Sequence, residues 1–200
     1  MGHRLRLVLL ASAAALALAA VSPWVDELAD AHLSAHMLEH VVIGDLAPAL
    51  VAVALASPVR RLPLPGPAPS FLLWAAVFGL WHLPRAYDLA EAHLAVHVAE
   101  HASFVAAGLL AWSQLVRLPP VRGVLLAVGM LMAGMLLTTA LLAPYHAIYE
   151  AYPSFRDQQL AALLMTCEQL LTLGTYVAVR VRLQAAAETG GTRVEHPFLA

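Results

Sequence analysis

The amino-acid sequence predicts an all-α membrane protein, folded as a six-transmembrane-helix bundle. Of its 200 residues, 61% are hydrophobic and only 12% are charged, which is about half the charge of an ordinary soluble domain. Six long apolar runs are too many for one water-soluble core, so much of the apolar surface must face lipid. The 11 basic residues are all arginine and are balanced by 13 acidic ones, which excludes a basic face for nucleic acid.

The membrane spans are predicted from runs of roughly 17 to 25 apolar residues, which prolines separate from one another. They lie at residues 5–22, 33–56, 69–84, 92–116, 121–143 and 157–182. Together they form a single transmembrane domain over residues 1–183. The polar residues 184–200 are expected to be a mobile cytoplasmic tail. The first run follows a basic start, so a cleaved secretory signal is an alternative reading of it.

The arginines predict the orientation of the bundle. Only Arg85 and Arg156 fall on one side of the six-span topology. The other side holds nine, namely Arg4, Arg6, Arg60, Arg61, Arg117, Arg122, Arg180, Arg182 and Arg193. Because basic residues concentrate on the cytoplasmic side, we expect the nine-arginine side and both chain ends to be cytoplasmic.

An internal repeat carries six of the ten histidines. Residues 27–40 (ELADAHLSAHMLEH) align with residues 88–101 (DLAEAHLAVHVAEH), and eight of the fourteen positions are identical. The offset of 61 residues corresponds to two helices and preserves the direction across the bilayer. We therefore expect a parallel internal repeat of helix hairpins, related by an axis along the membrane normal.

Each copy of the repeat holds three histidines spaced four residues apart. They are His32, His36 and His40 in the first copy, and His93, His97 and His101 in the second. At 100° per residue these rings share one side of a helix with Glu39 or Glu100. An ionisable group near the middle of the bilayer costs about 2.5 to 3.5 kcal/mol. The two polar stripes are therefore expected to face each other around a cavity in the bundle.

The topology also predicts the depth of these groups. The two repeat helices enter from the outer side, so His32 and His93 are expected near the outer surface. His40 and His101 would lie about 12 Å deeper, at 1.5 Å per residue. His82 ends the third span at the same outer face, so polar groups that are distant in sequence are expected to meet in the outer leaflet.

The sixth span adds polar groups to this picture. Asp157 is the first residue of this span, and its position is compatible with either a helix cap or a functional role. Glu168 lies about 16 Å further along, too deep for a cap, and implies a buried partner or a proton path. Met165 could add a thioether ligand. Asp45, by the same 100° arithmetic, is expected on the opposite side of the second span from His36.

Histidines at i and i+4 can share a metal ion, and two such pairs on adjacent helices can supply all the nitrogen ligands of copper or zinc. The predicted metal ligands are His36, His40, His97 and His101. Further ligands, or hydrogen-bond partners that fix the ring tautomers, are expected among His32, His93, His82, Glu39, Glu100, Asp157, Met165 and Glu168.

Other readings of the histidines stay open. A haem-binding membrane protein would use one histidine from each copy as axial ligands. A membrane zinc hydrolase would use three ligands, a water and a glutamate base, although the sequence has no HExxH motif. A structural scaffold, with the histidines as hydrogen-bonding contacts between helices, is the least specific reading.

Several motifs together resemble the CtaG-type cytochrome c oxidase assembly factors. The likeness runs from about residue 32 to residue 165 and includes the segment WHLPRAYD at residues 81–88. The HMxxH motif of the family corresponds to His36, Met37 and His40, its HxxxH motif to His97 and His101, and its DQxxA motif to Asp157, Gln158 and Ala161.

The resemblance implies a multi-pass protein of the bacterial inner membrane that is not an enzyme. It would help to make active haem-copper oxidase by bringing copper to it. The expected partners are cytochrome c oxidase subunits, a copper donor and the lipid bilayer, and copper is the expected metal.

Overall fold

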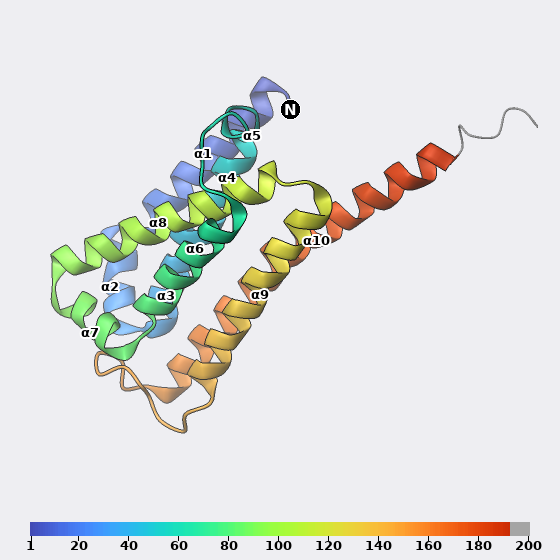
Figure 1. The fold of residues 1–200 in the computed structure, drawn as a ribbon. Helices are drawn as coiled ribbons and strands as arrows, with labels where there is room; N and C mark the ends of the chain where they lie inside the picture. The colour runs from blue at the N-terminus through green and yellow to red at the C-terminus, as the bar shows by residue number, and fades with distance from the viewer. Residues whose placement is uncertain (193–200) are drawn as a thin grey trace, which may run out of the picture.

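The structure is a computed structural model that describes residues 1–192, and every regular element in these residues is a helix (Figure 1). In chain order the helices are α1 (His3–Ala20), α2 (Pro23–Ala31), α3 (Leu33–Val41), the π-helix η1 (Val42–Leu46), α4 (Ala47–Ala54), α5 (Ala56–Val59), α6 (Pro67–Trp81), α7 (Pro84–Ala92), α8 (Leu94–Arg117), α9 (Pro120–Leu142) and α10 (Phe155–Thr192).

Five helical segments are long and apolar enough to cross a membrane, so the chain is a multi-pass membrane protein. They are α1, the continuous segment Leu33–Ala54, α8, α9 and α10. The predicted span at residues 69–84 corresponds to α6, an apolar helix of only 15 residues. At 1.5 Å per residue α6 covers about 22 Å, less than the roughly 30 Å of a hydrocarbon core. Six spans were predicted, and five helical segments of the described residues are long enough to cross.

The two copies of the repeated sequence adopt the same local conformation. Pro23 and Pro84 do not lie in loops but begin the nine-residue helices α2 and α7. Each of these helices ends at a histidine with extended backbone, His32 (φ −139°, ψ 119°) and His93 (φ −140°, ψ 108°). Because α3 and α8 start at the next residue, the prediction that all three histidines of a copy share one helix is wrong. His32 and His93 are exposed at the breaks.

The segment α3–η1–α4 lies at the centre of the bundle. α3 packs against α10, while η1 and α4 pack against α8, and α1 covers α4 from outside. Figure 1 shows α2, α7 and the loop 143–154 gathered at one end, which we call the capped end, and the N terminus and α5 at the other. Of the predicted polar tail, residues 184–192 continue α10 as helix, and the rest lies outside the described residues.

The π-helix η1 lies where the central segment crosses α8. The Ala47 N–H bonds to the Val42 carbonyl oxygen, five residues back, and Pro48 has no N–H to offer to Gly44. The Gly44 carbonyl instead packs against Gly108 of α8, so closely that a Cβ atom on Gly108 would collide with its oxygen. The two backbones can approach this closely because Gly108 has no side chain.

Replacing Gly108 with alanine should therefore destabilise the bundle. The new Cβ meets backbone atoms, which cannot swing away as a flexible side chain can, so we expect a loss of about 1 to 3 kcal/mol, as in other overpacked sites. Thermal unfolding in mild detergent measures it. The matched control is Gly79→Ala on α6, where a Cβ meets nothing within 4 Å. Equal melting temperatures for the two variants would contradict the close crossing.

Candidate metal centre

Four of the repeated histidines meet between two helices that are distant in sequence. His36 and His40 come from α3, and His97 and His101 come from α8. The Nε2 atoms of His36 and His40 lie 3.0 Å apart. Across the helix interface, the ring centroids of His36 and His97 are 5.6 Å apart and those of His40 and His101 are 5.2 Å apart. The four rings thus form one group.

Two glutamates cross between the helices to join this group. Glu100 Oε1 of α8 lies 3.7 Å from His40 Nε2 of α3. Glu39 Oε1 of α3 lies 3.7 Å from His101 Nδ1 of α8. Each carboxyl group therefore approaches the last histidine of the opposite helix, and both are buried, with Glu100 0% and Glu39 2% exposed.

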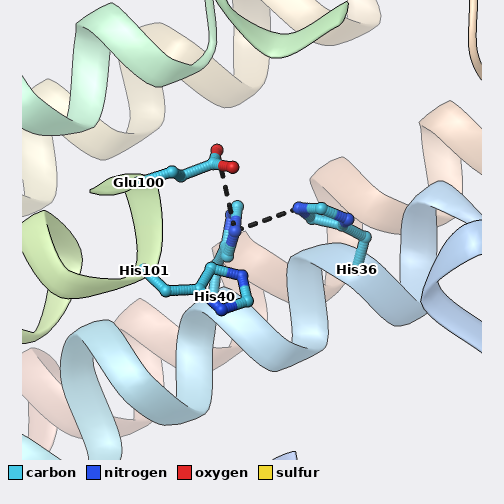
Figure 2. A group of neighbouring side chains, drawn as sticks. All are labelled: His36, His40, Glu100 and His101. Carbon is cyan, nitrogen blue, oxygen red and sulfur yellow. Dashed lines mark hydrogen bonds and ion pairs between the residues drawn. The ribbon is translucent and has the colours of Figure 1, made fainter. Parts of the chain in front are cut away.

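The tightest set of ligand atoms in the described residues comprises His36, His40, Glu100 and His101 (Figure 2). One ligand atom from each lies within 4.8 Å of all the others. In a tetrahedral site with ligands at about 2.0 to 2.1 Å, the donor atoms lie about 3.4 Å apart, so the four side chains would close by up to about 1.5 Å around an ion. Relative to the predicted ligands, Glu100 takes the place of His97 in this set.

His97 borders the centre without belonging to its tightest part. Its ring centroid is 4.2 Å from that of His101, and its Nδ1 atom is 3.9 Å from Glu91 Oε1. Its side chain is 20% exposed, whereas that of His36 is 1% exposed. His97 therefore lies on the more open side of the group.

The centre contains polar atoms that the described residues leave without a hydrogen-bond partner. They are Glu39 Oε2, His40 Nδ1, both carboxyl oxygens of Glu100 and His101 Nε2. In the described residues, Glu39 and Glu100 form ion pairs with histidines and none with an arginine. An unsatisfied buried polar group costs about 1 to 3 kcal/mol, and more when charged. A bound cation would supply the missing partner, so nitrogen and carboxylate donors here fit a metal ion.

Glu91 of α7 also belongs to the centre and was missed by sequence reasoning. Its Oε1 atom lies 3.2 Å from His36 Nδ1, and Tyr152 Oη lies 3.1 Å from its Oε2 atom. Burial raises the pKa of Glu91 above the ordinary value of a glutamate. The only signal was that Glu91 aligns with Asp30 in the repeat, as an acid in both copies, but Asp30 is exposed.

Asp157 does not reach the metal centre and instead fixes the start of α3. The Ser34 hydroxyl donates to Asp157 Oδ1 at 2.5 Å, and the Ser34 N–H donates to Oδ2 at 3.3 Å. The side chain of Asp157 thus satisfies one of the free N–H groups at the beginning of α3, that of Ser34. The cap of its own helix is Ser154, whose Oγ accepts from the Asp157 N–H at 3.3 Å.

Gln158 holds the loop of the capped end against α9. Its Nε2 donates to the Leu141 carbonyl at 2.7 Å, and its Oε1 accepts from the Ile148 N–H at 2.9 Å. From the same loop, Tyr149 donates to the His82 carbonyl at 3.0 Å. The hydroxyl of Tyr152 lies 2.6 Å from the Ala29 carbonyl oxygen and 3.4 Å from His36 Nδ1. The loop therefore closes the bundle directly above the histidines.

The remaining predicted residues lie on the inner side of the centre. His82, Met165 and Glu168 line a small internal cavity together with His40. Asp45 lines it as well, contrary to the expectation that it faces away from the histidines. The π turn η1 spreads one additional residue over the helix turn, so 100° per residue overestimates the rotation from His36 to Asp45.

The chain matches the family described as "cytochrome c oxidase caa3 assembly factor" over residues 3–184, and it belongs to that family. The match confirms the resemblance predicted from the histidine and DQxxA motifs. No curated protein and no solved structure matches the chain.

Replacing Asp157 with alanine should loosen the start of α3. The loss of a helix cap costs about 0.5 to 2 kcal/mol, so the variant should unfold at a lower temperature in detergent. The matched control is Gln159→Ala, an exposed position of the same helix. In a Ser34→Ala background the effect of Asp157→Ala should shrink, and an undiminished effect would show that Asp157 acts elsewhere.

Proposed function

We propose that this assembly factor binds copper at the metal centre and passes it to cytochrome c oxidase. The observation that carries the proposal is the set His36, His40, His101 and Glu100, buried between α3 and α8 with donor atoms that lack partners. Imidazole is a preferred ligand of copper and of zinc. Membership of an oxidase assembly family favours copper, because the oxidases assembled are haem-copper enzymes.

The depth of the centre suits delivery within the membrane. Its ligands begin one turn inside the capped end of α3, at His36, and nearly two turns inside that of α8, at Glu100. A copper acceptor embedded in a membrane-spanning oxidase could be loaded from a donor at a similar depth without exposing the ion to hydrocarbon. The partners in this proposal are oxidase subunits, which receive the ion, and a separate copper donor that supplies it.

The geometry of the rings favours a bare ion over haem. The ring centroids of His36 and His40 are 4.3 Å apart, and those of His97 and His101 are 4.2 Å apart. Rings in direct contact, within and across the two helices, leave no gap for a porphyrin between opposing histidines. A Soret absorption band in purified protein would nevertheless restore the haem reading.

The orientation follows from the arginines, which occupy the two ends of the bundle unequally. Of the described arginines, only Arg85, in α7, and Arg156, at the start of α10, belong to the capped end. By the positive-inside rule, the capped end with the metal centre would face the outside of the bacterial inner membrane, with both termini in the cytoplasm. Copper would then reach the centre from the extracytoplasmic side.

Removal of the ligands should remove copper. In protein purified in mild detergent, the variant with His36→Ala, His40→Ala and His101→Ala should hold at least one copper ion fewer per chain than the wild type, as measured by elemental analysis. The control with His32→Ala and His93→Ala changes histidines that are exposed, and it should keep its copper. An unchanged copper content in the triple variant would exclude these ligands.

The effect on the oxidase separates delivery from scaffolding. In a deletion strain, oxidase activity should fall, and added copper in the medium should restore part of it if the protein delivers the ion. Complementation with the triple histidine variant should fail at low copper while the protein still accumulates in the membrane. Full complementation by that variant would favour a scaffold that only recruits oxidase subunits.

The orientation has its own test. In a Cys167→Ser background, a cysteine introduced by Tyr145→Cys lies in the loop of the capped end, where Tyr145 is 97% exposed. It should react with a membrane-impermeant maleimide in intact spheroplasts. A cysteine introduced by Arg61→Cys, at the opposite end, should react only after lysis. The reverse labelling pattern would place the metal centre on the cytoplasmic side.

A further inference from the structure

A small internal cavity lies on the inner side of the metal centre. Its volume is about 30 Å³, and it is bounded by the central segment, α6, α8 and α10. Since one water needs about 10 to 15 Å³ of such volume, the cavity has room for about two waters or one metal ion. Its chemically active lining comprises Met37, His40, Asp45, His82, Met165 and Glu168.

His82 offers this cavity a nitrogen with a fixed lone pair. The side chain is only 4% exposed, and its Nδ1 lies 2.7 Å from the Phe78 carbonyl oxygen. A carbonyl only accepts, so Nδ1 carries the proton and Nε2 is the basic nitrogen. Nε2 is buried and has no hydrogen-bond partner in the described residues. A histidine held by a backbone carbonyl in this way has the arrangement typical of a metal ligand.

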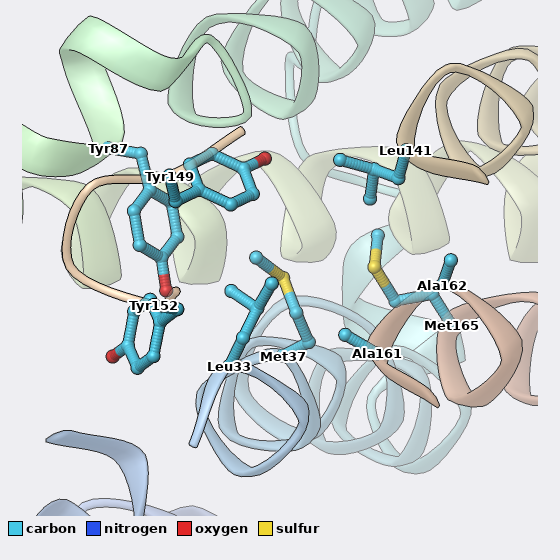
Figure 3. Packing of buried hydrophobic residues seen from close by; sticks show 9 residues of the cluster. All are labelled: Leu33, Met37, Tyr87, Leu141, Tyr149, Tyr152, Ala161, Ala162 and Met165. Atoms are coloured by element: carbon cyan, nitrogen blue, oxygen red, sulfur yellow. The ribbon is translucent and has the colours of Figure 1, made fainter. Parts of the chain in front are cut away.

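Two thioethers reach the same space from different helices. Figure 3 shows Met37 of α3 and Met165 of α10 on the same side of these two helices, with Leu33 beside Met37 and Leu141 beside Met165. Both are buried, at 1% and 3% exposure, and both line the cavity. Thioethers bind few biological cations well, and Cu(I) is foremost among them.

A carboxyl pair closes the far side of the cavity. Asp45 and Glu168 both line the cavity, and the Trp112 indole donates to Asp45 Oδ1 at 2.5 Å. Asp45 Oδ2 and Glu168 Oε1 are buried and have no hydrogen-bond partner among the described residues. Asp45 from η1 and Glu168 from α10 therefore border the cavity on this side.

His40 belongs to both sites. Its Nε2 atom faces His36 and Glu100 in the metal centre. Its ring also lines the cavity, and its Nδ1 atom is buried without a partner. The two sites are therefore separated by one imidazole ring.

We propose that this cavity is a second site for Cu(I), which receives the ion from the metal centre past His40 and holds it with Met37, Met165 and His82 Nε2. The transfer is a ligand exchange in which copper remains Cu(I), so no electron donor or acceptor is required. The inference rests on the proposed copper function of the metal centre and adds to it a second binding site with two thioether ligands.

The stoichiometry of Cu(I) binding tests the second site. Purified full-length protein is titrated anaerobically with Cu(I) in competition with a chromophoric chelator. The wild type should bind two ions per chain. The variant with Met37→Leu and Met165→Leu should bind one, and X-ray absorption at the copper edge should lose its sulfur signal. The matched control is Met130→Leu, a fully buried methionine outside the cavity, which should still bind two.

A second variant separates this inference from the proposed function. His36→Ala with His101→Ala removes ligands of the metal centre but leaves His40 in place, and it should retain one Cu(I) with sulfur ligands. If that variant binds no copper while the methionine variant keeps the wild-type amount, the metal centre stands and the second site is refuted. If it retains an ion that the methionine changes then remove, the second site stands whatever the fate of the first. A wild type that binds no Cu(I) overturns both.

Discussion

The structure depends on placing ionisable side chains inside an apolar bundle without arginine to neutralise them. Glu39 and Glu100 are buried, and each can be accommodated only beside a histidine of the opposite helix. Because each glutamate directly precedes the last histidine of its own motif, the reciprocal contacts fix the register of α3 against α8. A slide by one helical turn would break both contacts at once and move two buried carboxyl groups away from their histidines in a medium of low dielectric constant.

The capped end holds this register from outside. Asp157 binds the first turn of α3, and Gln158 ties the loop to α9. Tyr152 contacts Ala29, Glu91 and His36. The DQ pair of the family motif therefore lies outside the candidate ligand set: Asp157 fixes the start of the helix that carries His36 and His40, and Gln158 fixes the loop above it. A metal site is only as well defined as the shell that orients its ligands, and here that shell comes from the loop and from α10.

The sequence pattern located the main elements and the histidine cluster because periodicity records which side of a helix is polar. The repeated HxxxHxxEH motif was sufficient to predict that His36, His40 and His101 lie together, and the apolar runs were sufficient to find five spans. It failed where the backbone departs from a regular helix. A single extended residue at His32 or His93 leaves the spacing of four unchanged, so the breaks were invisible.

The failures at Asp45 and Glu91 have the same origin. Asp45 was misplaced because a π turn adds one residue without a sequence signal that a periodicity count detects, although Pro48 four residues after Gly44 is consistent with it. Glu91 was missed because it lies on α7, before the break, and its approach to His36 depends on how α7 folds back over α8. Tertiary placement of this kind follows from packing rather than from local pattern.

The irregular turn also explains why two similar sequence copies have different roles. The second copy continues as the regular helix α8 for 24 residues, whereas the first changes to η1 directly after its last histidine. Each copy contributes two members of the candidate ligand set, His36 and His40 from the first and Glu100 and His101 from the second. On the inner side of the histidines the two copies differ. The first copy contributes a carboxyl group, that of Asp45, to the cavity lining next to α10, whereas α8 contributes the apolar side chain of Phe104. Because the equivalent part of α8 lacks this turn, the cavity lies on one side of the four histidines, and under the proposed Cu(I) transfer an ion would leave on that side, past His40 and toward Glu168.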